Sequence, residues 1–128
     1  MENWQNPVFY FELPANDMGR AKSFYENVFG WNVQCSYENY YKADTAGIID
    51  GGGLSQISGT INGGIQKKDE TIGCVRIVIN VQNLDEALQK AIAEGGKIFI
   101  PKKKIPGMLY SVILDTEGNE INLVEAIK

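Results

Sequence analysis

The sequence contains no histidine, and this absence excludes several kinds of chemistry at once. Histidine is the commonest metal ligand and the usual general base near neutral pH. Without it, Ser-His-Asp and Cys-His catalysis and most transition-metal sites are excluded. No run of about 18 apolar residues occurs either, so we expect no transmembrane helix.

Cysteine is also scarce. Cys35 and Cys74 lie far apart and form no CxxC motif. Their simplest interpretation is as buried thiols in a reducing cytoplasm, with a disulfide between them as the alternative. The first residues, MENWQNPVFY, lack the basic region and apolar stretch of a secretory signal. We therefore expect a cytoplasmic protein.

The remaining composition is that of an ordinary acidic domain. The chain has 128 residues, within the size range of one domain, which we predict to span 1–128. A net charge of −4 argues against attraction to nucleic acid phosphates. The glycine-rich stretch 47–64 has no GK[ST] motif and no helix after it. We interpret it as a flexible loop leading into a short strand around residues 64–66, rather than as a phosphate-binding loop.

Residues 9–31, FYFELPANDMGRAKSFYENVFGW, have the pattern of a strand followed by a capped helix. Apolar residues alternate along the first part until Pro14, which is typical of a strand with two unlike faces. Asn16-Asp17 is an N-cap signal, and Gly30 is a typical C-terminal stop. The predicted helix runs from Asp17 or Met18 to Phe29, and its helically spaced apolar residues are Ala21, Phe24, Tyr25 and Val28.

The same pattern recurs 66 positions later, in residues 75–97. Phe11 then aligns with Ile77, and Asp17 with Asn83, which caps a second predicted helix. The apolar stripe of that helix comprises Leu84, Ala87, Leu88, Ala91 and Ile92. This duplication predicts two copies of a strand–helix–strand–strand–strand unit, in which each sheet has one bare face.

The segments that follow each helix complete the two units. Strands are expected at 31–36, 40–45, 97–100, 109–114 and 121–124. Residues 101–107, PKKKIPG, are interpreted as a basic loop whose lysines face solvent or bind an anion. The aromatic side chains after the first helix either line a cavity or pack in the core; they are Trp31, Tyr37, Tyr40 and Tyr41.

Four stretches together resemble the vicinal-oxygen-chelate superfamily, which includes glyoxalase I, extradiol dioxygenases and bleomycin-resistance proteins. They are ELPANDMGRAKSFYENVFGW, GTINGGIQKK, INVQNLDEALQKAIAEGGK and KIPGMLYSVILDTEGNEINLVE, and they span nearly the whole chain. The resemblance implies an α+β fold of two βαβββ modules, about 7–67 and 73–126. Their sheets would curve around a concave cavity, usually in a homodimer.

Metal-dependent relatives hold a divalent ion with side chains from the concave sheet. By alignment with this family, the ligand positions fall on Tyr10, Arg76 and Asn122, and near Gly63 to Ile65 on the fourth strand. Arginine is a permanent cation without a lone pair to donate. The resemblance therefore implies the scaffold of the family without its metal, and we expect no cofactor.

The candidate site residues follow from strand parity. The polar residues at the non-core positions are Tyr10, Glu12, Arg76, Asn80, Glu120 and Asn122. In one interpretation Arg76 binds an anionic group, with Tyr10 and Asn122 hydrogen-bonding beside it. In the other, Arg76 pairs with Glu12 or Glu120. The same two carboxylates are the candidates for a general base, or else they are ion-paired or at the surface.

These residues leave several hypotheses for function. The first is a metal-independent protein that binds a small polar or anionic organic ligand. The second is a metal-free lyase or isomerase that uses Glu12 or Glu120 as its base. Metal-dependent glyoxalase or dioxygenase chemistry is disfavoured by the missing ligands, and a purely structural dimer module is the fourth. We adopt the first, and expect neither nucleic acid nor membrane as a partner.

Overall fold

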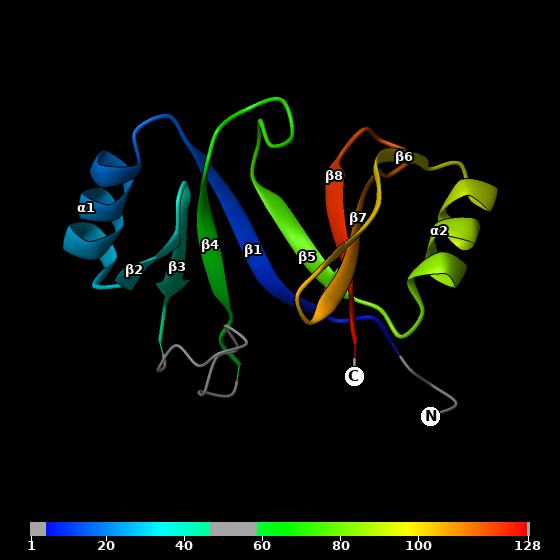
Figure 1. The fold of residues 1–128 in the computed structure, drawn as a ribbon, viewed down its shortest axis with the longest axis horizontal. Helices are drawn as coiled ribbons and strands as arrows, with labels where there is room; N and C mark the ends of the chain where they lie inside the picture. Colours follow the sequence, from blue (N-terminus) through cyan, green and yellow to red (C-terminus); the bar gives the residue numbers. More distant parts are fainter. Residues whose placement is uncertain (1–4, 47–58, 128) are drawn as a thin grey trace. The chain divides into compact units, whose positions relative to one another are not determined.

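The computed structural model describes residues 5–46 and 59–127 and contains the same order of elements twice (Figure 1). The first module comprises β1 (Val8–Ala15), α1 (Met18–Phe29), β2 (Asn32–Tyr37), β3 (Tyr40–Asp44) and β4 (Asn62–Lys67). The second comprises β5 (Arg76–Asn80), α2 (Leu84–Ala93), β6 (Lys97–Ile105), β7 (Met108–Leu114) and β8 (Glu120–Ala126). The predicted α+β class and the two βαβββ modules are confirmed. The chain divides into two compact units: one consists of residues 9–75, and the other combines the N-terminal residues up to Val8 with residues 76–128.

The first module has a mixed sheet in the order β2-β3-β4-β1. β1 and β4 run parallel, whereas the β2–β3 and β3–β4 pairs are antiparallel. The helix α1 packs on one face of this sheet. Its core comprises Val33, Ala43 and Ile65, against which the half-buried residues Leu13, Ala15, Met18, Ala21, Tyr25, Trp31 and Tyr41 pack. Of the two interpretations of the aromatic residues after α1, cavity lining and core packing, Trp31 and Tyr41 therefore fit core packing.

One close contact in this core depends on a glycine. Phe11 lies opposite Gly63 in the β1–β4 register, and its ring lies over the glycine. A β-carbon at position 63 would come within 2.3 Å of that ring. The Phe11 ring also contacts Trp31, with 5.6 Å between ring centroids. Gly63 is therefore required for the packing of β1 on β4.

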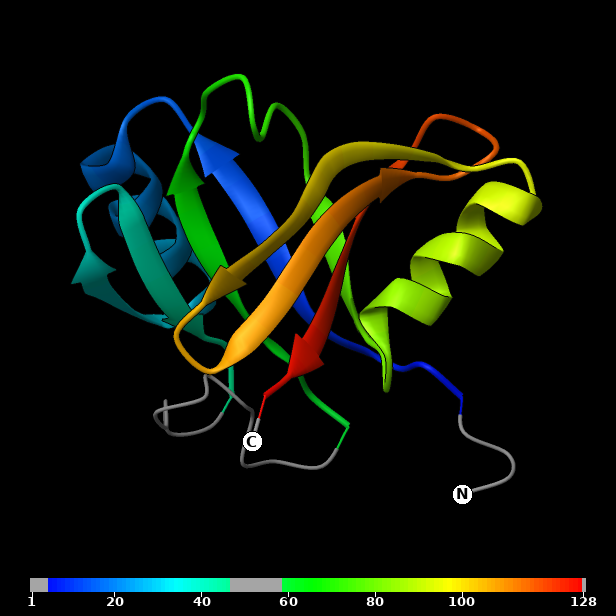
Figure 2. The same cartoon turned by 45° about the vertical axis from the view of Figure 1, so that its right-hand side comes forward.

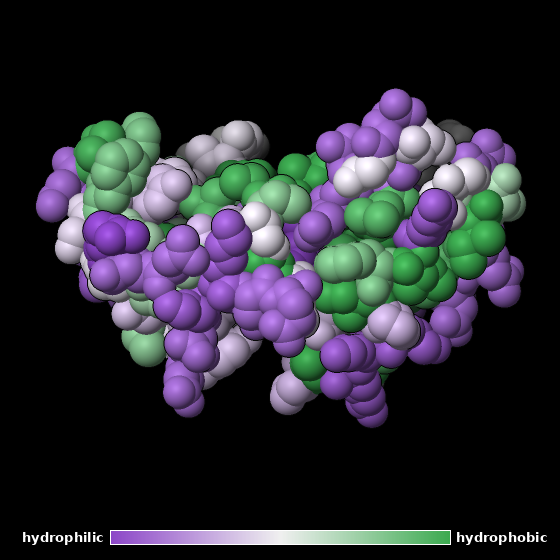
Figure 3. Space-filling model, turned by 90° about the horizontal axis from the view of Figure 1, so that it is seen from above, coloured by the Kyte–Doolittle hydropathy of each residue, from purple (hydrophilic) through white to green (hydrophobic). Residues whose placement is uncertain are grey.

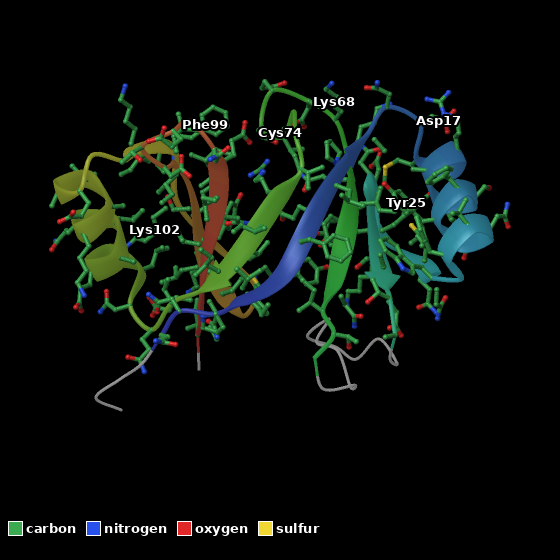
Figure 4. The ribbon with its side chains drawn as sticks, turned by 180° about the vertical axis from the view of Figure 1, so that it is seen from behind. Asp17, Tyr25, Lys68, Cys74, Phe99 and Lys102 are labelled. Carbon is green, nitrogen blue, oxygen red and sulfur yellow. The ribbon has the colours of Figure 1, made fainter. Side chains whose placement is uncertain are left out.

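The ends of both helices follow the sequence signals. Asp17, at the start of α1 (Figure 4), accepts a hydrogen bond of 2.9 Å from the backbone N–H of Arg20. Gly30 ends α1 with φ of 72°, a left-handed conformation that glycine adopts without strain. Asn83 caps α2 in the same way, accepting from the backbone N–H of Glu86 at 2.9 Å.

The second module has the sheet order β5-β8-β7-β6, with α2 on one face. β5 and β8 are parallel, and the other two pairs are antiparallel. Figure 2 shows β6 and β7 as a long, bent hairpin. The buried core between sheet and helix comprises Val81, Leu84, Leu88 and Leu123.

The predicted apolar stripes were too wide on both helices. Phe24 and Val28 on α1 and Ile92 on α2 are all more than half exposed. Each helix packs on a single sheet, so only the residues at the centre of its stripe are covered. Figure 3 shows hydrophobic and hydrophilic residues side by side on the face that it draws.

The interpretation of residues 101–107 as a loop was wrong for residues 101–105, and only residues 106–107 form a turn. β6 continues to Ile105, and its lysines pair with β7 across two register shifts. β6 is the outer strand of its sheet, where lysines are typical because they discourage pairing with another chain. Lys102 (Figure 4) forms an exposed ion pair of 2.8 Å with Asp85 of α2.

The cysteines also differ from the prediction. Cys35 and Cys74 are both free thiols, as expected, but both are exposed rather than buried. Cys35 occupies the outer strand β2, and Cys74 lies just before β5 (Figure 4). No helix among residues 5–46 and 59–127 is long and apolar enough to cross a membrane. The triple glycine at 51–53 lies outside the described residues.

Candidate ligand-binding site

Strand parity places the predicted residues of the second module on one sheet face. In the parallel register, Ile77 lies opposite Ile121 and Val78 opposite Asn122. Ile79 and Ile121 pack toward α2, so the alternating residues point to the other face. The predicted residues on that face are Arg76, Asn80, Glu120 and Asn122.

Arg76 and Glu120 form an ion pair in this face. The Arg76 Nε lies 3.4 Å from the Glu120 Oε1, and the two side chains are 4% and 18% exposed. The contact lacks hydrogen-bond geometry, so the pair is held by charge rather than by a directed bond. Of the two pairings considered for Arg76, the one with Glu120 is therefore present.

Two asparagines accompany this ion pair. Asn122 is buried and lies two residues from Glu120 along β8. Asn80 is half-buried at the end of β5, and its backbone N–H donates to the carbonyl of Pro7 at 2.9 Å. Asn80 lies at the opposite end of β5 from Arg76, so the two amides extend the polar face along the sheet with groups that can bind a polar ligand.

The first module presents a different chemistry on the sheet face turned away from α1. Tyr10 and Glu12 alternate with the core residue Leu13 along β1. The hydroxyl of Tyr10 lies 2.7 Å from that of Tyr40 on β3, within hydrogen-bond distance. The Tyr40 ring stacks on Tyr37 at 5.0 Å between centroids.

Both hydroxyls of this pair stay protonated near neutral pH. Burial raises the pKa of Tyr10 to about 12, and the negative charge of Glu12 adds to the effect. Burial and the neighbouring Tyr10 raise the pKa of Tyr40 as well. The pair therefore acts as a neutral hydrogen-bonding group and not as a base.

Sequence reasoning missed Asn62 as a member of this face, which also includes Tyr40, one of the aromatic residues with two interpretations, and Gly64, within the predicted fourth-strand position. Asn62 lies opposite Tyr10 in the β1–β4 register, and Gly64 follows two residues later. A β-carbon at Gly64 would come within 2.2 Å of the Tyr40 hydroxyl, so the glycine leaves the space that the phenol occupies. The signal was available in GTINGGIQKK, where an asparagine stands at polar parity directly before the two glycines.

The structure therefore gives two groupings of the predicted residues. Tyr10 and Glu12 belong to the unit of residues 9–75, whereas Arg76, Asn80, Glu120 and Asn122 belong to the other. A joint site built from both groups stays a prediction.

The side chains of neither group fit a transition metal. Within the described parts of the chain, no three His, Cys, Asp or Glu residues lie close enough together to hold an ion. The Tyr10 phenol is a poor ligand while protonated, and Arg76 places a cation where a metal would need a donor.

Comparison with known proteins adds family and fold. Residues 8–123 match the model of the Glyoxalase/Bleomycin resistance protein/Dioxygenase superfamily. A lactoylglutathione lyase from Haemophilus influenzae is 25% identical over 123 residues, covering 92% of this chain and 91% of the relative. A superfamily member from Vibrio splendidus aligns with a TM-score of 0.63 at 15% identity, over 96% of this chain and 100% of its own. A methylmalonyl-CoA epimerase from Mycobacterium tuberculosis gives 0.64 at 14% identity, over 94% and 88%.

Proposed function

Because the chain belongs to the Glyoxalase/Bleomycin resistance protein/Dioxygenase superfamily, as its sequence motifs predicted, we propose that it binds a small, polar or anionic organic ligand without a metal ion. In each module, the proposed binding surface is the sheet face turned away from that module's helix. The protein would act in the cytoplasm as a homodimer.

The observation that carries this proposal is the buried Arg76. The Arg76 side chain is 4% exposed, and its contact of 3.4 Å with the Glu120 carboxylate lacks hydrogen-bond geometry, so this ion pair compensates charge without a directed bond. A ligand carboxylate or phosphate accepts two parallel hydrogen bonds from a guanidinium and makes a stronger, directed contact. Asn122 and Asn80 lie on the same face and supply further hydrogen bonds.

A second candidate is a metal-free lyase or isomerase. The similarity to lactoylglutathione lyases, which extends over about nine-tenths of both chains, favours this alternative. Glu120 is the candidate base in the second module, because its side chain is partly accessible, at 18% exposed. Glu12 is the corresponding candidate in the first module.

Native mass spectrometry of the untagged protein tests the proposal most directly, because it reports metal, oligomer size and co-purified ligand together. We expect a dimer mass without stoichiometric metal. Dialysis against EDTA should leave the melting temperature unchanged. One metal ion per chain, or a melting temperature that falls with EDTA and recovers with metal, would contradict metal independence.

Variants of Arg76 test the binding role. Arg76→Lys retains the charge but loses the planar fork, and Arg76→Ala loses both. Any ligand that stabilises the wild-type protein in a thermal-shift screen should stabilise Arg76→Lys less and Arg76→Ala not at all. Arg20→Ala is the matched control, since Arg20 is the other arginine and lies exposed on α1. Equal stabilisation of Arg76→Ala and the wild type would exclude Arg76 from the site. Turnover lost with Glu120→Gln would favour the enzyme instead.

A further inference from the structure

Asn62 is a buried side chain with an unused hydrogen-bond donor. It is 1% exposed, and its Oδ1 accepts a bond of 3.1 Å from the backbone N–H of Thr45. This bond determines which end of the amide is the oxygen, so the other end is Nδ2. Nδ2 has no hydrogen-bond partner among the described residues. A buried amide without a partner costs about 1–3 kcal/mol, so a ligand atom that accepts from Nδ2 gains correspondingly.

The tyrosine pair leaves a second donor on the same face. Tyr10 and Tyr40 have two hydroxyl protons between them, and the single bond of 2.7 Å uses one. The other proton has no acceptor within the described part of the chain. Tyr10 lies opposite Asn62 in the register, so their side chains leave neighbouring strands on the same side.

We propose that Tyr10, Tyr40 and Asn62 form a binding subsite for a neutral carbonyl oxygen, such as that of a ketone, amide or ester. The Asn62 amide is an uncharged donor. The Tyr10 and Tyr40 phenols are uncharged donors too, because their raised pKa values keep them protonated. The negative charge of Glu12 acts on both hydroxyls and disfavours a ligand anion there. Gly64 keeps the position above the strand open to the Tyr40 phenol.

This inference deepens the proposed function, since it rests on that function for the existence of a ligand and names the ligand group that the first module receives. It involves residues 10–64 alone, whereas Arg76 and its neighbours belong to the other unit. The carbonyl subsite and the binding role of Arg76 can therefore be refuted independently of each other.

The test is a titration of the ¹⁵N-labelled full chain, followed through the side-chain amide resonances of Asn62. These are assigned by their loss in Asn62→Asp. Three probes share one ring: cyclohexanone, cyclohexanecarboxylate and cyclohexylammonium. We expect cyclohexanone to shift the Asn62 resonances saturably by about 50 mM, a range suited to fragments of this size. The carboxylate should bind at least about fivefold more weakly because the negative charge of Glu12 repels it, and the ammonium, which accepts no hydrogen bond, should cause no shift.

Matched variants make the assignment specific. The double variant Tyr10→Phe/Tyr40→Phe should weaken cyclohexanone binding at least about fivefold, whereas Tyr110→Phe in the second module should not. Asn62→Asp, of nearly the same shape and followed through the backbone amide resonances of β4 instead, should reverse the preference toward cyclohexylammonium. Absence of a saturable shift with cyclohexanone, or equal affinity for all three probes, would overturn the subsite. Persistence of cyclohexanone binding in Arg76→Ala would support it even if the Arg76 site fails its own test.

Discussion

Replacing Glu120 by glutamine removes one charge of the ion pair with Arg76 and leaves a guanidinium that is only 4% exposed. At 3.4 Å, two unit charges attract by about 5 kcal/mol with an effective dielectric constant of about 20. Part of this is offset by the desolvation of both groups. We therefore expect Glu120→Gln to lower the free energy of unfolding by about 3 kcal/mol, at the low end for buried pairs.

Removing the charge of Arg76 instead should lower the free energy of unfolding by less. Arg76→Met keeps most of the buried volume and leaves the Glu120 carboxylate, which is 18% exposed and can turn toward water. We expect a loss of about 1–2 kcal/mol. The double variant has neither charge and should be no less stable than Arg76→Met, so the coupling free energy of the cycle should be about 3 kcal/mol or more.

Urea unfolding of the four proteins, at one protein concentration, measures this cycle. A coupling below about 0.5 kcal/mol would refute the reasoning, because the two charges would then be satisfied independently. We predict the larger loss of unfolding free energy for Glu120→Gln because Arg76 is more deeply buried than Glu120. A larger loss for Arg76→Met would refute that explanation.

Three further predictions concern the first module. Burial raises the pKa of Tyr10 to about 12 in the folded state, so Tyr10 contributes stability that is present below pH 10 and lost as pH rises. Between about pH 9 and 11, the wild type should lose about 1.3 kcal/mol relative to Tyr10→Phe in urea unfolding, and parallel curves would contradict the shift. Gly63→Ala should cost about 1–3 kcal/mol because its methyl meets the Phe11 ring, whereas the control Gly19→Ala, with 3.7 Å to its nearest neighbour, should stabilise α1 by up to about 1 kcal/mol. Asp17→Ala should lower the melting temperature through the loss of a cap worth about 1 kcal/mol, and Asp17→Asn should retain most of it.

The features that sequence predicts well here are those decided by neighbours along the chain. Asp17 and Gly30 determine the ends of α1 through bonds within a few residues, and the prediction of Met18–Phe29 is confirmed. The repeat at 66 positions likewise identified β5 and α2, because equal periodicity gives equal local structure. The second cap at Asn83 follows the same rule.

Features decided by distant partners were harder to predict. The lysines of β6 are in a strand because β7 pairs with them, and a segment beginning with Pro101 and ending with Gly107 contains no local sign of this. Asn62 was overlooked because its glycine neighbours suggested a loop, while its burial depends on β1 and β3. Burial of the cysteines was expected from their residue type, but strand position leaves Cys35 exposed.

The two modules show how one backbone unit supports two kinds of polar face. Equivalent positions on the first strand hold Tyr10 and Arg76, which are 66 residues apart in the repeat. Each lies on the sheet face turned away from its helix, where the core does not restrict residue type. Tyr10 lies among neutral donors, and Arg76 is paired with a carboxylate. Titrating a neutral ketone against Tyr10→Phe/Tyr40→Phe, and a carboxylate against Arg76→Lys, would measure the contribution of each face separately. Binding of the ketone should be weakened by the tyrosine variant, and binding of the carboxylate by the Arg76 variant.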